Sequence, residues 1–430
     1  MDGSRALRPP RQPRKAANSG TPPFSEVKIG IAGPIDLSAL RRWCSPPPDL
    51  PRPYSFPLIG PLAGQLRSRG FSIVVFCGSP AAHQTRHWAG DGVEIYVTPR
   101  RSRRAAYDFY RLERKGLADA MKAARCDILH AHWCYEFAAA ALDSGIPSLI
   151  TCHDSPNEVY HYMRWSRAYP FWWFRCLLGR RVVRQARFLS AVSPHVEKNV
   201  LSLRRDRPVL RVIPNGIGEN LFLLGKERLA QGEPAGALTF ASVLEGFSRI
   251  KNAPTALRAF AEFRQRHPEA RWRMFGGDFE AGGKAEQWAR RHGCAAGVSF
   301  EGHLPQERLH RTLHHSIHIL LHPSRTESHP LAVIEAQALG IPVIGGARSG
   351  GVPFTLAEGG AGFLADVESP ESLSLVMQKV AADSEGRKAM ARKAWDFAWN
   401  HFGEDKMVEN YLSFYRAILA QQGGGSGFSS

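Results

Sequence analysis

Short apolar runs alternate with longer segments of helical hydrophobic spacing through most of the chain. From Val27 onwards the runs are VKIGIAG, FSIVVFCG, VEIYVT, CDILHAH, PSLITCHD and FLSAVS, followed in the second half by ALTFASV, WRMFGGD and VSFEGHL. Continuous apolar runs of this kind are typical of strands buried on both faces, and their alternation with helices predicts parallel sheets covered by helices. We therefore expect an α/β protein whose ligands bind beyond the carboxyl ends of the strands.

The stretch from Leu320 to Pro353 shows this alternation most clearly. It continues the run IHILL, which predicts a buried strand, and it then turns through the sequence PSR. A helix should follow at once, with Ser328 as its N-cap, Pro330 in the first turn and Gly340 just after its end. Most positions of that helix are apolar, so we expect it inside a domain. The following PVIG predicts a second buried strand.

Two carboxylates interrupt the apolar pattern of this stretch. Glu327 falls in the turn, and Glu335 falls inside the helix. An unpaired buried carboxylate is costly, so each should meet a partner or a ligand. The helix start also offers free N–H groups and partial positive charge, which suit a phosphate. Together these features favour a phosphorylated, polyhydroxylated ligand; the alternative is that Glu327 caps the helix and Glu335 lies in solvent.

Length and composition place this pattern in a two-domain protein. The chain has 430 residues, which suit two domains of about 200 residues each. Hydrophobic residues make up 43% and charged residues 22%, an ordinary globular composition. Residues 1–23 are rich in Arg, Pro and Ser, and we expect a disordered basic tail there. This start has no apolar leader region and no run is long enough to span a membrane, so we expect a cytoplasmic location.

The charge is the unusual feature of the composition. The formal net charge is +17 and the isoelectric point is near 9.9, which favours polyanionic partners such as nucleotide diphosphates, anionic lipid surfaces, acidic glycans or nucleic acid. The alternative is arginine spread over a solvated surface. The seven cysteines form no C-x-x-C pair, so we expect reduced, packed thiols rather than disulfides or a zinc ribbon.

The segment PSRTESHPLAVIEAQALGIPVI resembles the E-x7-E signature of retaining nucleotide-sugar glycosyltransferases of the two-Rossmann-domain (GT-B) type, above all glycosyltransferase family 4. The resemblance runs from about Val27 to Ala420 and is stronger in the second half. It implies two Rossmann-like domains whose parallel sheets face each other across a cleft. The implied division is an acceptor domain at 24–220, a nucleotide-sugar donor domain at 221–403, a C-terminal helix at 404–420 that returns to the first domain, and a flexible tail at 421–430.

The resemblance also implies roles for residues of the second domain. Glu327 would hold the sugar hydroxyls and Glu335 the ribose hydroxyls. Lys251 and Arg249 would bind the leaving diphosphate; many relatives have Lys-Gly where this chain has Lys251-Asn252, so Lys251 matches well and Arg249 only loosely. The backbone N–H groups of three residues would assist them, and two glycines would surround the base and phosphates: Ser328, His329 and Leu331, then Gly276 and Gly302.

Strand ends of the first domain supply further candidates. His153 ends the strand SLITC as a similar histidine does in the family, where it faces the donor sugar; the alternative is a packed histidine beside a capping Asp154. Gly33 and His132 are weaker candidates for a phosphate loop or the acceptor. His130, His132 and His153 could ligate a metal, but no acidic or thiol cluster supports this. We expect no metal and no cofactor, since family relatives work without a bound metal and no Asp-x-Asp motif appears.

Residues 157–187 combine aromatic rings with a basic run and almost no acid. This composition is typical of an interfacial helix on an anionic membrane, and it would equally suit a surface that grips a large acceptor. The alternative is that the aromatic rings pack inward beneath a solvated basic face. A peripheral position on the inner face of the cytoplasmic membrane is therefore one expectation for this segment.

The resemblance implies transfer of a sugar from a nucleoside diphosphate donor to an acceptor hydroxyl with retention of anomeric configuration, in glycan, polysaccharide or glycolipid biosynthesis. One alternative is a synthase that acts on a small free sugar or sugar phosphate. Another is a non-catalytic basic protein that binds polyanions on the same fold. Against the last, Glu327 and Glu335 would repel a polyanion, and no nucleic-acid-binding motif is visible, so we expect no nucleic acid partner.

Overall fold

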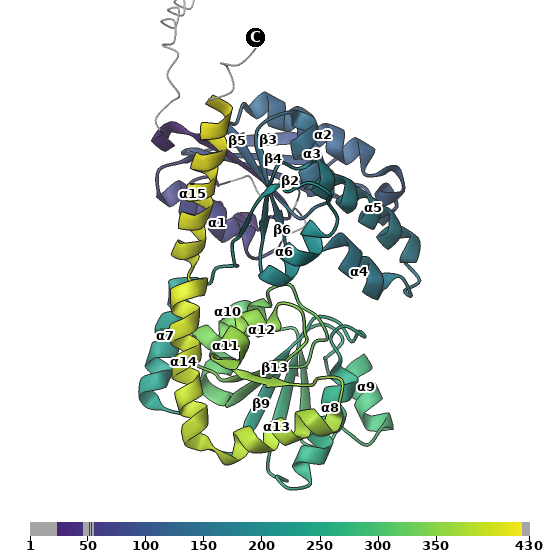
Figure 1. Cartoon of the computed structure of the whole chain (residues 1–430), viewed down its shortest axis with the longest axis vertical. Helices are drawn as coiled ribbons and strands as arrows, with labels where there is room; N and C mark the ends of the chain where they lie inside the picture. The colour runs from purple at the N-terminus through teal and green to yellow at the C-terminus, as the bar shows by residue number, and fades with distance from the viewer. Residues whose placement is uncertain (1–23, 46–50, 52, 54–55, 424–430) are drawn as a thin grey trace, which may run out of the picture.

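The computed structural model describes residues 24–45, 51, 53 and 56–423 and contains two α/β domains, one above the other in Figure 1. The expected tail at 1–23 lies outside the described residues, as does the part of the expected C-terminal tail from residue 424 onwards. Residues 421–423 instead form the end of the last helix, α15 (Glu404–Gly423). The predicted fold class of two α/β domains built on parallel sheets is confirmed.

The first domain contains an eight-stranded sheet in the order β3-β4-β2-β1-β5-β6-β7-β8. All of its neighbouring strands pair in parallel except β3 (Arg86–Ala89), which runs antiparallel to β4 at the edge. The apolar-run criterion missed β3 because only one of its faces is partly covered. The remaining strands are β1 Lys28–Ala32, β2 Ser72–Ser79, β4 Val93–Pro99, β5 Ile128–His132, β6 Ser148–Cys152, β7 Phe188–Ala191 and β8 Val209–Val212.

The second domain contains a six-stranded sheet in the order β11-β10-β9-β12-β13-β14, with every neighbouring pair parallel. The central strands β9 and β12 are buried almost completely, whereas β11 at the edge is only partly buried. The strands are β9 Thr239–Val243, β10 Arg271–Phe275, β11 Val298–Gly302, β12 Ile319–His322, β13 Val343–Gly346 and β14 Phe363–Ala365.

Helices cover both faces of each sheet, and apolar clusters fill the layers between them. Those of the first domain are η1 Phe24–Glu26, η2 Leu37–Leu40, α1 Ile59–Ser68, η3 Arg103–Asp108, α2 Arg111–Ala124, α3 Glu136–Ser144, α4 Pro156–Met163, α5 Tyr169–Gln185 and α6 Pro194–Leu201. Those of the second are α7 Glu219–Gln231, α8 Ala253–Arg264, α9 Lys284–Arg291, α10 Gln306–Ser316, α11 Leu331–Ala338, α12 Val352–Thr355, η4 Ala357–Gly359, α13 Pro370–Ala382 and α14 Ser384–Phe402.

The last helix returns the chain to the first domain. After α14 the chain passes upward in Figure 1, and α15 lies along the first domain beside α1. Its apolar side enters the core of that domain, where Phe414 and Tyr415 are fully buried. The Tyr415 hydroxyl lies 2.6 Å from Nδ1 of His130 on β5. The two domains are therefore joined both at the chain connection after β8 and through this helix.

Residues 157–187 form α4 and α5 rather than one helix, and their side chains divide between interior and surface. Phe171 is buried, and the Arg175 guanidinium lies 3.7 Å from the ring centre of Tyr135. Trp165 and Tyr169 are instead 77% and 55% exposed. The segment thus combines the inward packing of one interpretation with the outward aromatic and basic face of the others. All seven cysteines are unpaired and buried.

Candidate active site

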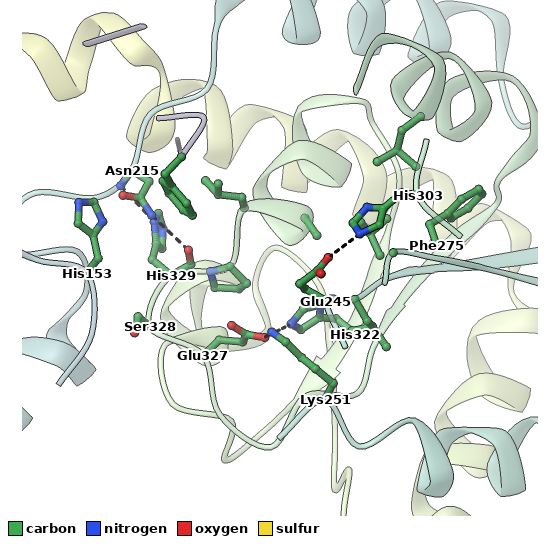
Figure 2. A pocket seen from close by; sticks show the side chains of 18 of the residues that line it. His153, Asn215, Glu245, Lys251, Phe275, His303, His322, Glu327, Ser328 and His329 are labelled. Atoms are coloured by element: carbon green, nitrogen blue, oxygen red, sulfur yellow. Dashed lines mark hydrogen bonds and ion pairs between the residues drawn. The ribbon is translucent and has the colours of Figure 1, made fainter. Parts of the chain in front are cut away.

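A cavity of about 430 Å³ lies between the domains at the carboxyl ends of β9, β10 and β12. The second domain supplies most of its walls, and the first domain closes one side (Figure 2). Its position at the strand ends agrees with the general rule for parallel sheets. The lining residues are Phe56, Trp133, His153, Asn215, Val243, Leu244, Glu245, Lys251, Phe275, Gly276, His303, Leu304, Leu309, His322, Glu327, Ser328, His329, Pro330, Leu331 and Ala332.

Glu327 and Lys251 meet in this cavity. The Lys251 ammonium donates to Oε1 of Glu327 at 2.6 Å, and Nε2 of His322 lies 3.3 Å from the same oxygen. Burial acts to raise the pKa of Glu327, but the charge of Lys251 and the hydrogen bond from His322 outweigh it and hold that pKa well below its usual range. Glu327 is therefore a carboxylate at neutral pH, and the site holds one fixed negative and one fixed positive charge side by side.

The backbone of Glu327 is fixed by the loop after β13. The Glu327 N–H donates to the Ser349 carbonyl at 3.3 Å, and the Gly351 N–H donates to the Glu327 carbonyl at 2.6 Å. Gly350 has φ +64°, a conformation that glycine adopts readily. A Cβ atom at Gly351 would lie 1.9 Å from the Ser328 carbonyl oxygen. The sequence Ser-Gly-Gly is thus required for this close approach of two backbone segments.

The start of α11 differs from the expectation. The helix begins at Leu331 after Pro330, and Ser328 makes no side-chain cap. Instead the Ser328 carbonyl accepts a hydrogen bond from the Ser193 hydroxyl of the first domain at 2.6 Å. The prediction of Ser328 as N-cap was therefore wrong, because a contact between domains takes the place of a local one. The first N–H groups of α11, those of Leu331 and Ala332, lack helical partners and belong to residues that line the cavity.

Asn215 connects the domains beside His329. The Asn215 N–H donates to Nδ1 of His329 at 3.1 Å, and its side-chain amide donates to the His329 carbonyl at 3.2 Å. Since Nδ1 accepts this bond, the neutral His329 ring carries its proton on Nε2. Burial and the nearby His153 lower the pKa of His329 to about 3, so the ring stays neutral.

His153 lies on the first-domain side of the cavity, opposite Lys251 in Figure 2. Its Nε2 is 2.9 Å from Nδ1 of His132, and burial lowers the pKa of His153 to about 3. His132 stands behind it and does not line the cavity. A neutral His153 can bind sugar hydroxyl groups as donor or acceptor. The metal alternative has no support among the residues that the structure describes, where no group of three or more metal-ligating side chains occurs.

The structure places Glu335 away from Glu327. Glu335 lines a second cavity of about 740 Å³, bounded by α1, α7, α10 and α11. There Nε2 of His310 lies 3.4 Å from its carboxylate and the Gln306 amide lies 3.5 Å away. Leu331 lines both cavities, so the two glutamates flank the start of one helix. The solvated alternative for Glu335 is wrong, because its side chain is only 13% exposed.

Several predicted residues do not reach the first cavity. Arg249 is exposed and outside its lining, and its carbonyl accepts a hydrogen bond from Arg325. The assignment of Arg249 to the diphosphate is therefore not supported by its position. Gly276 does line the cavity, whereas Gly302 sits behind it against Glu280. Gly33 is outside the lining of the cavity and packs against Ile59, whose side chain would lie 2.8 Å from a Cβ atom at Gly33.

Other lining residues were not singled out from the sequence. His322 could have been, because it ends the strand that precedes Glu327 and the carboxyl ends of strands form sites in this architecture. Glu245 and His303, 3.4 Å apart, follow the ends of β9 and β11 in the same way. Phe56 and Trp133 of the first domain make an edge-to-face pair with ring centres 4.9 Å apart. No local signal marked these two rings, since they meet only through the fold.

Comparisons with known proteins match both domains. Residues 60–220 match the family described as Glycosyltransferase Family 4, and residues 228–396 match the family described as Glycosyl transferases group 1. The resemblance inferred from the sequence is confirmed, and the chain belongs to the glycosyltransferases of the GT-B fold that are of the family 4 type.

Individual relatives agree with this assignment. The chain is 34% identical to the D-inositol 3-phosphate glycosyltransferase of Corynebacterium kroppenstedtii over 179 residues, which are 40% of this chain and 39% of that protein. It is 28% identical to the D-inositol 3-phosphate glycosyltransferase of Stackebrandtia nassauensis over 303 residues, 65% of this chain and 66% of the relative. The matches to the first curated relatives span about half of their length or less.

Solved structures support the fold over nearly the whole chain. Sucrose-phosphate synthase from Thermosynechococcus elongatus superposes with a TM-score of 0.72 at 17% identity, covering 92% of this chain and 100% of that one. An Anabaena protein in complex with UDP-glucose superposes with a TM-score of 0.64 at 16% identity, covering 91% and 100%. At these identities the likeness establishes the GT-B fold.

Proposed function

We propose that this glycosyltransferase transfers a sugar from a nucleoside diphosphate donor to an acceptor hydroxyl and retains the anomeric configuration. The observation that carries this proposal is the meeting of Glu327, Lys251 and the start of α11 in one cavity. A departing diphosphate needs cationic and dipolar stabilisation, which Lys251 and the N–H groups of Leu331 and Ala332 can supply. No metal or other cofactor is required for this neutralisation.

The remaining polar groups suit the other parts of such a donor. Glu327, ionised and facing the cavity, can accept hydrogen bonds from sugar hydroxyls, and the neutral His153 can contact the sugar from the first domain. Glu335, in the adjoining cavity on the other side of Leu331, would accept hydrogen bonds from the ribose hydroxyls. The solved relative in complex with UDP-glucose agrees with a donor of this class.

A panel of nucleoside diphosphate sugars tests the donor. The matching donor should raise the melting temperature by roughly 5–10 °C at a concentration of about 100 dissociation constants, because binding then adds about 2.7 kcal/mol to the free energy of unfolding. The product of transfer should keep the anomeric configuration of the donor, measured from proton coupling constants at the anomeric carbon. Activity should persist in EDTA. An inverted product would contradict the proposal.

A second candidate concerns the acceptor. The curated relatives are D-inositol 3-phosphate glycosyltransferases, and one structural relative is a sucrose-phosphate synthase. These names favour a small phosphorylated polyol or sugar as an alternative to a polymeric or lipid-linked acceptor. Transfer assays with inositol 3-phosphate and fructose 6-phosphate, beside lipid-linked acceptors in vesicles, separate the two. Turnover of only the phosphorylated small molecules would decide for this second candidate.

The exposed residues of α5 and of the turn between α4 and α5 favour the larger acceptor. We name as the aromatic-basic face the exposed rings Trp165, Tyr169 and Trp173 with the exposed Arg164 and Arg167. Aromatic rings interleaved with cations suit the headgroup region of an anionic membrane. Among the described residues no helix is long and apolar enough to cross a membrane. We propose that this face rests on an anionic lipid surface that presents the acceptor.

Vesicle flotation tests the membrane proposal. The protein should float with vesicles that contain phosphatidylglycerol at low salt, and binding should weaken as salt rises because the cations are screened. Neutral phosphatidylcholine vesicles should not bind it. Replacing Trp165 and Trp173 by serine should reduce flotation at least tenfold, whereas Leu375→Ser, at an exposed apolar residue of the second domain, should not. Equal flotation of both variants would contradict the proposal.

A further inference from the structure

The turn that carries Glu327 is held from both domains. Within the second domain, Ser349 and Gly351 bind only the Glu327 backbone. From the first domain, Ser193 donates to the Ser328 carbonyl, and Asn215 binds His329. The residue on the other side of Glu327, Thr326, is also bound by the first domain. Each neighbour of Glu327 in the turn 326–329 therefore contacts the opposite domain, while the Glu327 side chain faces the cavity.

The contact at Thr326 comes from α4. The Thr326 hydroxyl donates to Oε1 of Glu158 at 2.7 Å. Nε2 of His195, on α6, lies 2.8 Å from the same oxygen, and the Asn199 amide lies 3.4 Å from the other. Side-chain exposures of 20% for Glu158 and 25% for His195 leave this group mostly shielded from solvent. A charged acceptor in a shielded position makes this a strong type of hydrogen bond.

The charge on Glu158 persists despite its burial. Burial acts to raise the pKa of this carboxyl, but the hydrogen bonds from His195 and Thr326 outweigh it and lower the pKa below its usual range. Glu158 is thus a carboxylate at neutral pH. Among the residues that the structure describes, its hydrogen-bond partners are His195, Asn199 and Thr326. The Thr326 hydroxyl is the partner that links Glu158 to the second domain.

We propose that Glu158 is a positioning residue of the reaction, which fixes the catalytic turn through Thr326 when the two domains close. This inference rests on the proposed function, since it assigns Glu327 to the donor sugar. If the second domain alone fixed the turn, Glu327 would keep the same position in the open and in the closed cleft. The bond between Glu158 and Thr326 joins the two domains, so in our proposal it is made when the cleft closes and lost when it opens, and α4 couples closure of the first domain to the geometry at Glu327.

This coupling predicts that loss of the contact lowers the turnover rate but leaves the affinity for the donor nearly unchanged. A donor that binds the second domain meets Lys251 and the start of α11 without help from Glu158. Loss of the Glu158 contact should therefore leave the donor dissociation constant within about twofold while kcat falls about tenfold. A merely structural role for Glu158 would lower the melting temperature and leave kcat of the folded enzyme unchanged.

Matched variants isolate the contact. Thr326→Val removes the hydroxyl at nearly constant shape, and Thr326→Ser keeps it. Glu158→Ala removes the acceptor, and His161→Ala changes an exposed side chain of the same helix as a control. For each variant we would measure kcat, the dissociation constant of the donor identified in the panel, and the radius of gyration of the unliganded protein by small-angle X-ray scattering. Ser193 and Asn215 keep their contacts in every variant, so folding should be preserved.

The expected pattern is specific. Thr326→Val and Glu158→Ala should each lower kcat about tenfold, and the double variant should lose no more than either alone, because both remove the same bond. Thr326→Ser should retain most of the rate. The radius of gyration should be larger in Thr326→Val than in Thr326→Ser, since the closed state is less populated. His161→Ala should match the wild type throughout.

Two outcomes overturn the inference. An unchanged kcat in Thr326→Val, or losses that multiply in the double variant, would remove the positioning role of Glu158. If the wild type turns over no nucleotide sugar, the proposed function fails, and the scattering comparison decides the inference alone: equal radii for Thr326→Val and Thr326→Ser would remove the contact as a determinant of closure.

Discussion

Replacing Lys251 by methionine should lower kcat/KM for sugar transfer by about a thousandfold. The ammonium of Lys251 lies 2.6 Å from Glu327 at the side of the cavity where the diphosphate departs in our proposal. A preorganised charge aimed at developing negative charge contributes about two to three orders of magnitude to the rate in comparable sites. Methionine keeps most of the length and volume of the lysine but cannot neutralise the phosphate.

The loss should come from the chemistry and not from the fold. The Lys251 and Glu327 side chains are 22% and 17% exposed, so the pair is mostly shielded from solvent, but His322 still contacts Glu327 in the variant and the loss should cost only about 1–3 kcal/mol. The melting temperature should then fall by only a few degrees. Arg249→Met provides the control, because Arg249 is a cation of the same loop that lies outside the cavity. We expect its kcat/KM to stay within about twofold of the wild type.

Glu327→Gln should lower kcat/KM by at least a hundredfold. Glutamine preserves the shape of Glu327 and can still bind hydroxyls, but it removes the negative charge beside Lys251 and weakens the hydrogen bonds to the sugar. Because the two residues act on one donor, the double variant should lose less than the product of the single losses. Wild-type turnover in either single variant would remove this pair from the active site.

The candidacy of this pair came from the local pattern around Glu327 and, for Lys251, from the family resemblance. Glu327 belongs to a strand–turn–helix unit whose apolar pattern, proline and glycine fix the backbone within a short stretch. Lys251 follows the end of β9, the neighbour of β12, so the parallel order of strands brings the two loops together. Arg249, only two residues away, points elsewhere. Hydrophobic periodicity does not determine the direction of a side chain within a loop. The exposure of Arg249 therefore became visible only in the structure.

Contacts that join the domains could not be predicted in the same way. The bonds from Glu158 to Thr326, from Ser193 to Ser328 and from Asn215 to His329 connect segments far apart in the chain. No hydrophobic periodicity marks them, since each is a single polar pair. The hydrogen bond from Ser193 to the Ser328 carbonyl occurs where the sequence predicted a local N-cap. The edge strand β3 was not predicted for a related reason: its short alternating pattern lacks the apolar run that marks a buried strand.

The protein should lose stability steeply between pH 6.5 and pH 5. Several histidines are almost wholly buried, among them His130, His132 and His329, which are 0%, 3% and 5% exposed. Burial lowers the pKa of His130 and of His329 to about 3, and burial with neighbouring histidines lowers that of His132 well below its usual range. Each ring is therefore neutral in the folded state at pH 5, whereas in the unfolded chain it takes up a proton below about pH 6.5.

The sign of the effect follows from proton uptake. Below about pH 6.5 the unfolded chain binds more protons than the folded one, so the free energy of unfolding falls as the pH falls, until the folded pKa near 3 is reached. Each histidine contributes about 1.4 kcal/mol per pH unit in this window. His130, His132 and His153 lie in the first domain and would take up three protons on unfolding, while folded Asp154, whose pKa burial raises to about 6, offsets about one of them. That domain should therefore lose about 3 kcal/mol per pH unit, a large share of the 5–15 kcal/mol typical of a domain.

The carboxylates of Glu327 and Glu158 act in a different window. The pKa of Glu327 and that of Glu158 are lowered by their hydrogen-bond partners, so the stability they contribute is present above their unfolded pKa of about 4.3 and is lost only as the pH falls below it. A loss that is already steep at pH 6 to 5 is therefore assigned to the histidines. The midpoint of urea unfolding, measured at pH 7.5, 6.5, 5.5 and 5.0, separates the two windows.

His130→Gln provides the decisive comparison. His130 lies 2.6 Å from both the Tyr415 hydroxyl and the Thr151 hydroxyl, and a glutamine amide can bind both without taking up a proton. This variant should reduce the pH dependence of the first domain by about one proton, or about 1.4 kcal/mol per pH unit. His303→Gln, at a side chain that is 68% exposed, should leave the dependence unchanged. A constant midpoint from pH 7.5 to 5.0 would show that the buried rings become charged without cost, and the neutral hydrogen bonding assigned here to His130, His132 and His329 would be wrong.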